Sequence, residues 1–286
     1  MIGFTISSVY SIFNKLLVII RDWIFATGWV VVGPRLAERV DTYKEIIWPR
    51  INGNVLEIGP GFAESLRFLP RATLKDGSEV VDPKIITSYT IVEPNAFMFE
   101  KMQQNAERYG FNVRYDTMSF PEGAKIVTKA GSSEMATFNI VKGTLDYVDD
   151  IPEAVLKNAP YDSIAASSAL CTVGNLEVTL QNIFKLLRPG GTFYFIEHVR
   201  HPEHNHPSVI EENGVNAWLW GKIQDWVTPA WKVFVGYGCH LNRRTGEVIA
   251  SMDGWKTVEY KSVRVSGHLE ANILPMSFGT AVKPAN

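Results

Sequence analysis

The sequence predicts an α/β fold built on a doubly wound, mostly parallel seven-stranded sheet. From Asn54 onward, short apolar segments alternate with segments of helical periodicity, a pattern typical of parallel sheets with helices on both faces. A glycine turn follows the first apolar segment, as in the first strand–turn–helix unit of such sheets. The length of 286 residues, 46% of them hydrophobic, suits one large globular domain, or one domain with an appendage.

The elements can be placed in chain order from this alternation. The predicted strands are residues 55–58, 88–93, 137–143, 161–168 and 192–199, followed by two late strands at 254–265 and 278–284. The predicted helices are residues 63–69, 97–110, which stops at a glycine, and 175–187. We expect the two late strands to pair antiparallel at the sheet edge. Two polar stretches, 71–87 and 112–134, are predicted to be surface insertions.

Residues 1–34 form an apolar N-terminal segment, which is predicted to be helical. Lys15 and several serines interrupt it, and it lacks the small-residue cleavage site of a signal peptide. Three interpretations remain open. The segment lies in or on a membrane, it packs on the domain as a helical lid, or it forms a single transmembrane span. The remaining residues, 35–286, are predicted to be one domain with a tryptophan-rich helical cap at about 207–238.

Composition excludes several classes of function. The formal net charge of −2 gives no sign of the concentrated basic face that nucleic-acid binding needs. The two cysteines, Cys171 and Cys239, are too few for a disulfide framework, so we expect packed thiols in a reducing compartment. Four histidines fall within residues 198–206, but no cysteine lies near them in sequence. That stretch therefore favours a histidine-bearing loop, and no metal site is predicted.

The turn in "NVLEIGPGFAESLRFLP" has the features of a ligand-binding turn. Gly59 and Gly61 let the backbone approach a ligand closely. The third glycine of a dinucleotide site is missing, and Glu64 in the first helical turn would repel a pyrophosphate. Glu57, two residues before Gly59, suits a cationic amino-acid end instead, unless it is a structural carboxylate. S-adenosylmethionine has such an end, carries a sulfonium charge and has no phosphate.

A second acid is expected at the end of the second strand, where it would accept hydrogen bonds from ribose hydroxyls. Asp82 lies at about the usual spacing from the turn, whereas Glu93 follows the better strand and precedes a strong helix. We choose Glu93 and interpret Asp82 as a solvated loop acid.

Several motifs together resemble the class I S-adenosylmethionine-dependent methyltransferases. They are "LEIGPGFAESLRFLP", "IVEPNAFMFEKM", "YDSIAASSALCTVGN" and "LLRPGGTFYFIEHV". With "NAWLWGKIQDWVTPAWKVFVGYGCHLNRRT", the chain is similar more narrowly to the methyltransferase-like seven group, the membrane-associated thiol S-methyltransferases. The sequence departs from that group at five positions, which leaves the acceptor in doubt more than the cofactor: Pro60, Phe62, Ala63, His240 and Asn242.

The resemblance implies a role for each matching residue. The methionine end of S-adenosylmethionine would be held by the turn residues Glu57, Gly59, Pro60 and Gly61. Glu93 would hold the ribose, and four residues would lie near the adenine: Pro94, Asn95, Thr144 and Leu145. Ser167 and Ser168 would lie near the methionine carboxylate or the acceptor, or simply cap the strand end.

The predicted activity is methyl transfer to a thiol or another small lipophilic acceptor. A thiol is already partly ionised at neutral pH, whereas a hydroxyl would need a base, for which His198 is the candidate unless it is structural. The cap tryptophans are predicted to be core or to roof an apolar acceptor pocket: Trp218, Trp220, Trp226 and Trp231. Alternatives are an O- or C-methyltransferase of a secondary metabolite or lipid, or a cofactor-bound cyclase or scaffold. The resemblance implies an endoplasmic-reticulum or lipid-droplet membrane location; a cytoplasmic one is the alternative.

Overall fold

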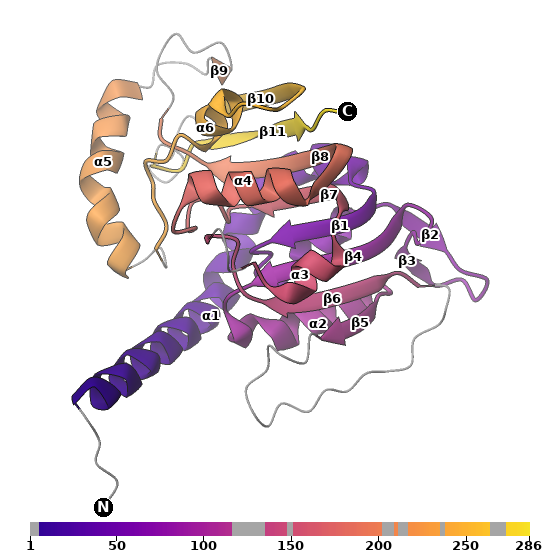
Figure 1. Cartoon of the computed structure of the whole chain (residues 1–286), viewed down its shortest axis with the longest axis horizontal. Helices are drawn as coiled ribbons and strands as arrows, with labels where there is room; N and C mark the ends of the chain where they lie inside the picture. Colours follow the sequence, from indigo (N-terminus) through magenta and orange to yellow (C-terminus); the bar gives the residue numbers. More distant parts are fainter. Residues whose placement is uncertain are drawn as a thin grey trace, which may run out of the picture.

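The computed structural model describes residues 6–115, 135–147, 151–201, 209–210, 217–234, 238–263 and 273–286. Nine strands of these residues form one sheet, in the spatial order β5-β6-β4-β1-β7-β8-β11-β10-β9 (Figure 1). From β5 to β8 all neighbouring strands are parallel, and β11 is antiparallel to both β8 and β10. The strands are β1 (Gly53–Ile58), β4 (Ile86–Glu93), β5 (Asn112–Tyr115), β6 (Thr137–Lys142), β7 (Tyr161–Ser167), β8 (Leu187–His198), β9 (Val209–Ile210), β10 (Thr257–Val263) and β11 (Met276–Val282).

This sheet confirms the predicted doubly wound α/β class and the antiparallel pairing of the two late strands. All seven expected strands are present, and β5 and β9 add two more. The strand β5 lies inside the predicted polar insertion 112–134, so that prediction was wrong for its first residues. Val113 and Tyr115 pack against the core while Arg114 between them is exposed, the alternation of a half-buried edge strand. Residues 116–134 lie outside the described part.

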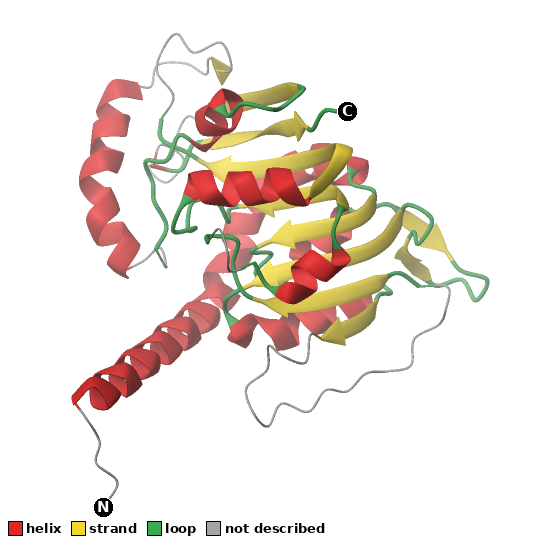
Figure 2. Cartoon of the chain, viewed as in Figure 1, coloured by secondary structure: helices red, strands yellow, loops and turns green. Residues whose placement is uncertain are grey.

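Helices cover both faces of the sheet (Figure 2). The helices α1 (Ile6–Ile47) and α2 (Phe99–Arg108) pack on one face, and α3 (Glu153–Asn158), α4 (Leu176–Leu186) and α6 (Thr245–Ser251) pack on the other. Successive residues of β1 divide between the two cores: Val55 belongs to the α1 side, and Leu56 and Ile58 belong to the α4 side. The sheet is therefore buried on both faces, as the continuous apolar strands predict.

The ends of two predicted helices follow their sequence signals. Asn175 caps α4 by accepting a hydrogen bond from the N–H of Val178 at 3.1 Å. Gly110, with φ of 79°, follows the end of α2 in the left-handed conformation that favours glycine. The predicted helix at 63–69 was wrong, because only a 3-10 turn, η2 (Glu64–Phe68), forms there. Ala63 before it has φ of 56°, which breaks the helical geometry.

The predicted insertion at 71–87 is a hairpin packed on the domain. Its two strands, β2 (Arg71–Thr73) and β3 (Glu79–Val81), pair antiparallel in a sheet of their own. The N–H of Val81 donates to the carbonyl of Tyr109 at 2.9 Å, and the Val81 side chain is buried. The hairpin thus anchors the turn after α2.

The N-terminal segment is helical, as predicted, but α1 runs 42 residues and continues through Pro34 into the domain. Its later part is anchored in the core by Ala26, Val40 and Ile47. Its earlier part projects from the body (Figure 1). Within the described ranges, no helix has both the length and the apolarity needed to cross a bilayer.

Candidate active site

The carboxyl ends of the parallel strands meet at one edge of the sheet, and the glycine turn lies at its centre. The strand order reverses beside β1, which sits between β4 and β7, and ligands of doubly wound sheets bind at this switch point. Gly59 and Gly61 have φ of 57° and 59°, so both occupy the left-handed region. A Cβ atom added to Gly59 would come within 2.8 Å of the Ala169 Cβ. The turn is therefore closely packed at Gly59, and a larger residue there would displace it.

Glu57 is enclosed by side chains on the α1 face of the sheet. Its Oε1 accepts from the Ser65 hydroxyl at 2.7 Å, and its Oε2 accepts from the Tyr89 hydroxyl at 2.8 Å. Burial raises the pKa of Glu57, and the Lys44 ammonium and the two hydroxyls oppose that rise. Both oxygens are thus engaged by the protein, as expected of a carboxylate that fixes β1 against α1 and η2. Its predicted contact with the cofactor amino group stays a prediction.

Glu93 ends β4 directly beside the glycine turn. Its Oε1 accepts from the Asn95 N–H at 3.0 Å, and its carbonyl accepts from the Gly143 N–H at 3.2 Å. Burial raises the pKa of Glu93 to about 7, against the hydrogen bonds from the N–H groups of Asn95 and Gly61. A buried carboxylate with so few donors is suited to hydroxyl groups of a ligand.

Asp82 lies at the opposite edge of the sheet. It precedes β4, and its carbonyl accepts from Ile86, the first residue of that strand, at 2.8 Å. Its Oδ1 accepts from the Lys84 N–H at 2.9 Å, a local loop contact. Of the two acids considered from the sequence, only Glu93 therefore lies near the glycine turn.

The middle of α1 packs against the carboxyl edge of the sheet. The sequence did not indicate which residues make this contact. Asn95 Nδ2 donates to the backbone carbonyl of Asp22 at 3.0 Å, and Asn95 Oδ1 accepts from the Phe97 N–H at 3.1 Å. The Trp29 indole lies against the glycine turn, because its Nε1 is 3.2 Å from the position of a Cβ on Gly61. The middle of α1 thus packs on the domain, and its role as a lid stays a prediction.

The ends of β6 and β7 supply the remaining predicted cofactor residues. Leu145 is buried, and its carbonyl accepts from Asn182 Nδ2 at 2.9 Å, while Thr144 is half-buried. Ser167 and Ser168 are half-buried at the end of β7, and Ser168 has φ of 55°. Its N–H donates to the carbonyl of Ile196 in β8 at 2.8 Å. The serines thus lie near the glycine turn, since the next residue, Ala169, lies beside Gly59.

Glu197 and Arg243 organise the turn after β7, and neither was singled out in the sequence. Glu197 is fully buried, and its oxygens accept from the N–H groups of Ala169 and Leu170, each at 3.0 Å, and of Cys171 at 3.3 Å. Arg243 donates to the carbonyls of Leu170 and Val173 in the same turn. The "EHV" motif could have indicated the role of Glu197, because an acid inside an apolar strand needs buried hydrogen-bond partners.

His198 lies at the end of β8 in contact with a thiol. Its Nε2 is 2.9 Å from Cys239 Sγ, and Cys171 lies in the same buried group. Burial alone would lower the pKa of His198, but the facing Cys239 sulfur outweighs it and raises that pKa. The neighbouring Cys171 thiol makes the largest contribution to lowering the pKa of Cys239 to about 4, and His198 also lowers it. The predicted packed thiols are buried as expected, and the role of His198 as a base stays a prediction.

The tryptophan-rich cap forms α5 (Ala217–Phe234), which stands beyond the strand ends (Figure 1). Trp218 and Trp226 are 68% and 84% exposed, so the expectation that they belong to the core was wrong. Trp231 is half-buried, and its indole contributes to lowering the pKa of Cys239. Gln224 ties α5 to the body by donating from Nε2 to the carbonyls of Val199 and Leu241, each at 3.0 Å.

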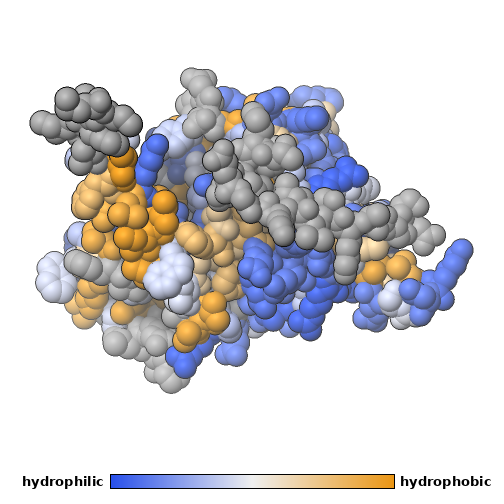
Figure 3. All heavy atoms as spheres, turned by 90° about the horizontal axis from the view of Figure 1, so that it is seen from below, coloured by the Kyte–Doolittle hydropathy of each residue, from blue (hydrophilic) through white to orange (hydrophobic). Residues whose placement is uncertain are grey.

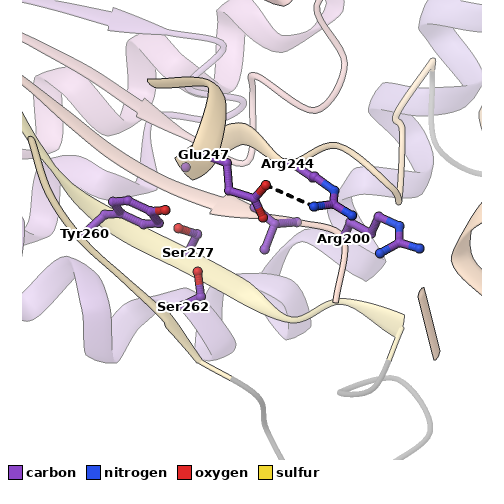
Figure 4. Close-up of a pocket in the computed structure, with 8 residues that line it drawn as sticks. Arg200, Arg244, Glu247, Tyr260, Ser262 and Ser277 are labelled. Carbon is purple, nitrogen blue, oxygen red and sulfur yellow. Dashed lines mark hydrogen bonds and ion pairs between the residues drawn. The ribbon is translucent and has the colours of Figure 1, made fainter. Parts of the chain in front are cut away.

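A small pocket lies elsewhere, between α6, β10 and β11 (Figure 4). Arg244 and Glu247 form an ion pair of 3.1 Å at its rim, and Tyr260, Ser262 and Ser277 line it. Its volume of about 10 Å³ has room for about one water molecule. It is therefore not the cofactor site.

A doubly wound sheet with a glycine turn at its switch point and an acid ending the next strand is the ligand-binding arrangement of Rossmann-like folds, and a methyltransferase family match assigns this chain among them. The chain belongs to the methyltransferase domain family, which matches residues 35–246. It is 32% identical to rat thiol S-methyltransferase TMT1B over 104 residues, which are 36% of this chain and 33% of the relative. It is 33% identical to the mouse TMT1B over 210 residues, 73% of this chain and 59% of the relative.

A solved structure supports the same fold. A chain of the complex between the Haloferax volcanii Trm112 methyltransferase activator and a methyltransferase aligns with a TM-score of 0.50 at 14% identity. The alignment covers 91% of this chain and 97% of that chain. The chain spans between a third and three fifths of the length of the two thiol S-methyltransferases. The predicted methyltransferase class and cofactor are confirmed by the family.

Proposed function

We propose that this methyltransferase transfers the methyl group of S-adenosylmethionine to the thiol of a small lipophilic acceptor. One observation carries the choice of acceptor: the two ionisable side chains that end β8 already have close partners, and of their polar atoms only the buried His198 Nδ1 has no hydrogen bond. The Glu197 carboxylate accepts hydrogen bonds from three backbone N–H groups, and His198 Nε2 faces the Cys239 sulfur. A thiol needs no base, since it ionises in part at neutral pH. The identity to the thiol S-methyltransferases supports the same acceptor.

The residues of the carboxyl edge fit the cofactor. The backbone of the turn at Gly59 and Gly61 would hold the methionine end, and the Glu93 carboxylate would accept hydrogen bonds from the ribose hydroxyls. Leu145 and Asn95 border the place of the adenine. When bound, S-adenosylmethionine supplies an electrophilic methyl group on its sulfonium.

The chain contributes orientation and exclusion of water. The helix α1 closes one side of the cofactor edge through Trp29 and Asp22, and α5 stands beyond the strand ends (Figure 1). The acceptor sulfur attacks the methyl group in line, and aligned approach in a dry site accounts for much of such catalysis.

Turnover of labelled S-adenosylmethionine with a panel of lipophilic thiols and a matched panel of phenols tests the acceptor. Methylation of thiols with little or none of phenols is the expected result. Preferred methylation of phenols would instead assign O-methyl transfer with His198 freed as a base. Calorimetric binding of the cofactor without turnover of either panel would favour a protein that no longer transfers methyl groups.

We also propose that the projecting part of α1 binds a membrane surface. Its side chains between Tyr10 and Val31 include twelve exposed large hydrophobic residues, among them Leu17 at 47% and Trp23 at 55% exposure. Figure 3 shows hydrophobic side chains gathered on the side from which α1 projects. Tryptophan and tyrosine suit the membrane–water boundary, where such a helix lies with its apolar residues in the lipid. Flotation with phospholipid vesicles tests this location.

A further inference from the structure

The cysteines of the chain come together with a histidine at the carboxyl edge of the sheet. Only two cysteines occur in 286 residues, and Cys171 and Cys239 are far apart in the sequence. Together with His198 they offer ligand atoms that all lie within 4.8 Å of one another. All three side chains are more than 90% buried. Polar and ionisable groups gathered in this way in an interior require a compensating partner.

The type and number of donors match a zinc site with an open position. Two thiolates and one imidazole form the protein ligand set of one class of catalytic Zn²⁺ site, which leaves a fourth place for a small ligand. With bonds of about 2.3 Å to sulfur and 2.0 Å to nitrogen, a tetrahedral site separates sulfur from nitrogen by about 3.5 Å. The contact of 2.9 Å between His198 and Cys239 must therefore open by about half an ångström. His198 Nδ1 is buried and has no hydrogen-bond partner, so this nitrogen is available to a ligand or a water molecule.

The surroundings hold the donors in place from three separate elements. Cys171 lies in the turn that Glu197 fixes through three N–H groups, and His198 follows Glu197 in β8. The N–H of His240 donates to the carbonyl of Cys171 at 2.9 Å, which joins the Cys239 segment to that turn. The Arg243 guanidinium, which bonds two carbonyls of the same turn, opposes a cation, and the Glu197 carboxylate offsets its charge.

A disulfide is the other arrangement that two neighbouring cysteines can form. It would join only the two sulfurs, and the histidine on Cys239 would have no part in it. A metal ion uses all three donors, and two thiolates neutralise the charge of Zn²⁺ in a buried place. The observed grouping of two sulfurs and a nitrogen therefore favours the ion.

We propose that Cys171, His198 and Cys239 bind one Zn²⁺ ion and that its fourth position takes the sulfur of the acceptor. The second part rests on the proposed thiol methyltransferase function. Acceptor binding as a thiolate releases one proton to solvent. The site lies beside the glycine turn, because Ala169 of the Cys171 turn lies next to Gly59.

The metal content of the tagless, full-length protein tests the first part without cofactor or acceptor. About one zinc per chain is expected by mass spectrometry of the metals, with loss of most of it in Cys171→Ser and Cys239→Ser. The matched control His240→Asn changes a histidine outside the group. It keeps the backbone N–H that bonds Cys171, and the asparagine amide can replace His240 Nδ1, which lies 3.2 Å from the Cys171 carbonyl, so this variant should keep the metal. Absence of zinc after supplementation, with two free thiols or with a mass two hydrogens lower from a disulfide, overturns the proposal.

Cobalt substitution keeps the test valid if the cysteine variants fail to fold. The wild-type protein loaded with Co²⁺ should show sulfur-to-metal charge transfer and tetrahedral absorption bands, and a spectrum without thiolate bands overturns the ligand set. Addition of a lipophilic thiol should shift these bands, whereas an unchanged spectrum overturns the fourth-position assignment. Methyl transfer is measured separately, so thiol turnover without bound zinc would reject the metal site and leave the proposed function standing.

Discussion

Asn95 at the end of β4 donates from Nδ2 to the backbone carbonyl of Asp22 in α1 at 3.0 Å. The same side chain accepts from the Phe97 N–H at 3.1 Å and so begins the turn η3 (Ala96–Met98). One buried amide therefore joins the cofactor edge to the helix that projects toward solvent. The position of α1 and the shape of the predicted adenine site are coupled through this bond.

Replacing Asn95 with serine should keep the cap and break the bond to α1. Loss of one side-chain hydrogen bond costs about 0.5–1.5 kcal/mol in the free energy of unfolding, because the Asp22 carbonyl remains within the helix α1. Asn175→Ser is the matched control, because Asn175 caps α4 through Oδ1 and should lose only a few tenths of a kcal/mol on replacement by another good cap. Denaturant unfolding and amide hydrogen exchange near Asp22 measure the effect. Equal losses in the two variants would contradict the coupling.

The glycine turn gives a second prediction. Gly59→Ala should lose cofactor affinity by tenfold or more, on the order of 1.4 kcal/mol, because the added Cβ would meet the Ala169 Cβ at 2.8 Å. Gly77→Ala is the control, since Gly77 also has positive φ, of 84°, but has no atom within 4 Å of an added Cβ. Both variants pay about 1 kcal/mol for the left-handed backbone. Calorimetry with S-adenosylmethionine should therefore give a lower affinity for Gly59→Ala than for Gly77→Ala. Equal affinities would rule out the contact with Ala169 as a cause of weaker binding.

The sheet and the cofactor edge could be predicted because their signals are local. The apolar runs around Leu56, Ile91 and Ile164 give the strands, and the glycines and the Glu93 that ends β4 follow them directly in the chain. Parallel strands then place these turns at one edge without further information. The late antiparallel pair was also readable, since two apolar stretches remain after the last helical segment.

The parts that sequence reasoning missed depend on contacts between distant residues. Asp22 and Asn95 are 73 positions apart, and nothing near either residue indicates the other. Cys171 and Cys239 meet only because β7, β8 and the segment after α5 converge. The helix predicted at 63–69 was wrong because Ala63 adopts the left-handed conformation, whereas alanine ordinarily favours helical geometry.

Glu93 predicts a pH dependence of cofactor binding. Burial raises the pKa of Glu93 to about 7, and the ionised carboxylate accepts from ribose hydroxyls more strongly than the protonated acid, which has lost part of its acceptor capacity. The affinity for S-adenosylmethionine should therefore fall as the pH drops below 7, on the order of tenfold per pH unit at the limit. Glu93→Gln should bind weakly with a flat profile, and Asp82→Asn should behave as wild type. A pH profile that persists in Glu93→Gln would assign the titration to another group.

The same carboxylate affects the stability of the cofactor-free protein with a definite sign. The folded pKa of about 7 lies above the unfolded value of about 4.3, so the folded state binds more protons in that window. This contribution to the free energy of unfolding therefore falls as the pH rises from about 4.5 to about 7. Thermal unfolding across this range should show a smaller fall for Glu93→Gln than for wild type. An identical fall would show that Glu93 is not the group responsible.

The exposed apolar part of α1 gives the last prediction. Leu17→Glu places a charge where Leu17 is 47% exposed, and it should reduce flotation with phosphatidylcholine vesicles several-fold while leaving cofactor affinity unchanged. Leu156→Glu makes the same change at a leucine that is 51% exposed on α3, on the opposite face of the sheet, and it should float as wild type. Because both leucines face solvent, neither charge disturbs the core. Equal flotation of wild type and both variants would mean that α1 does not bind the lipid.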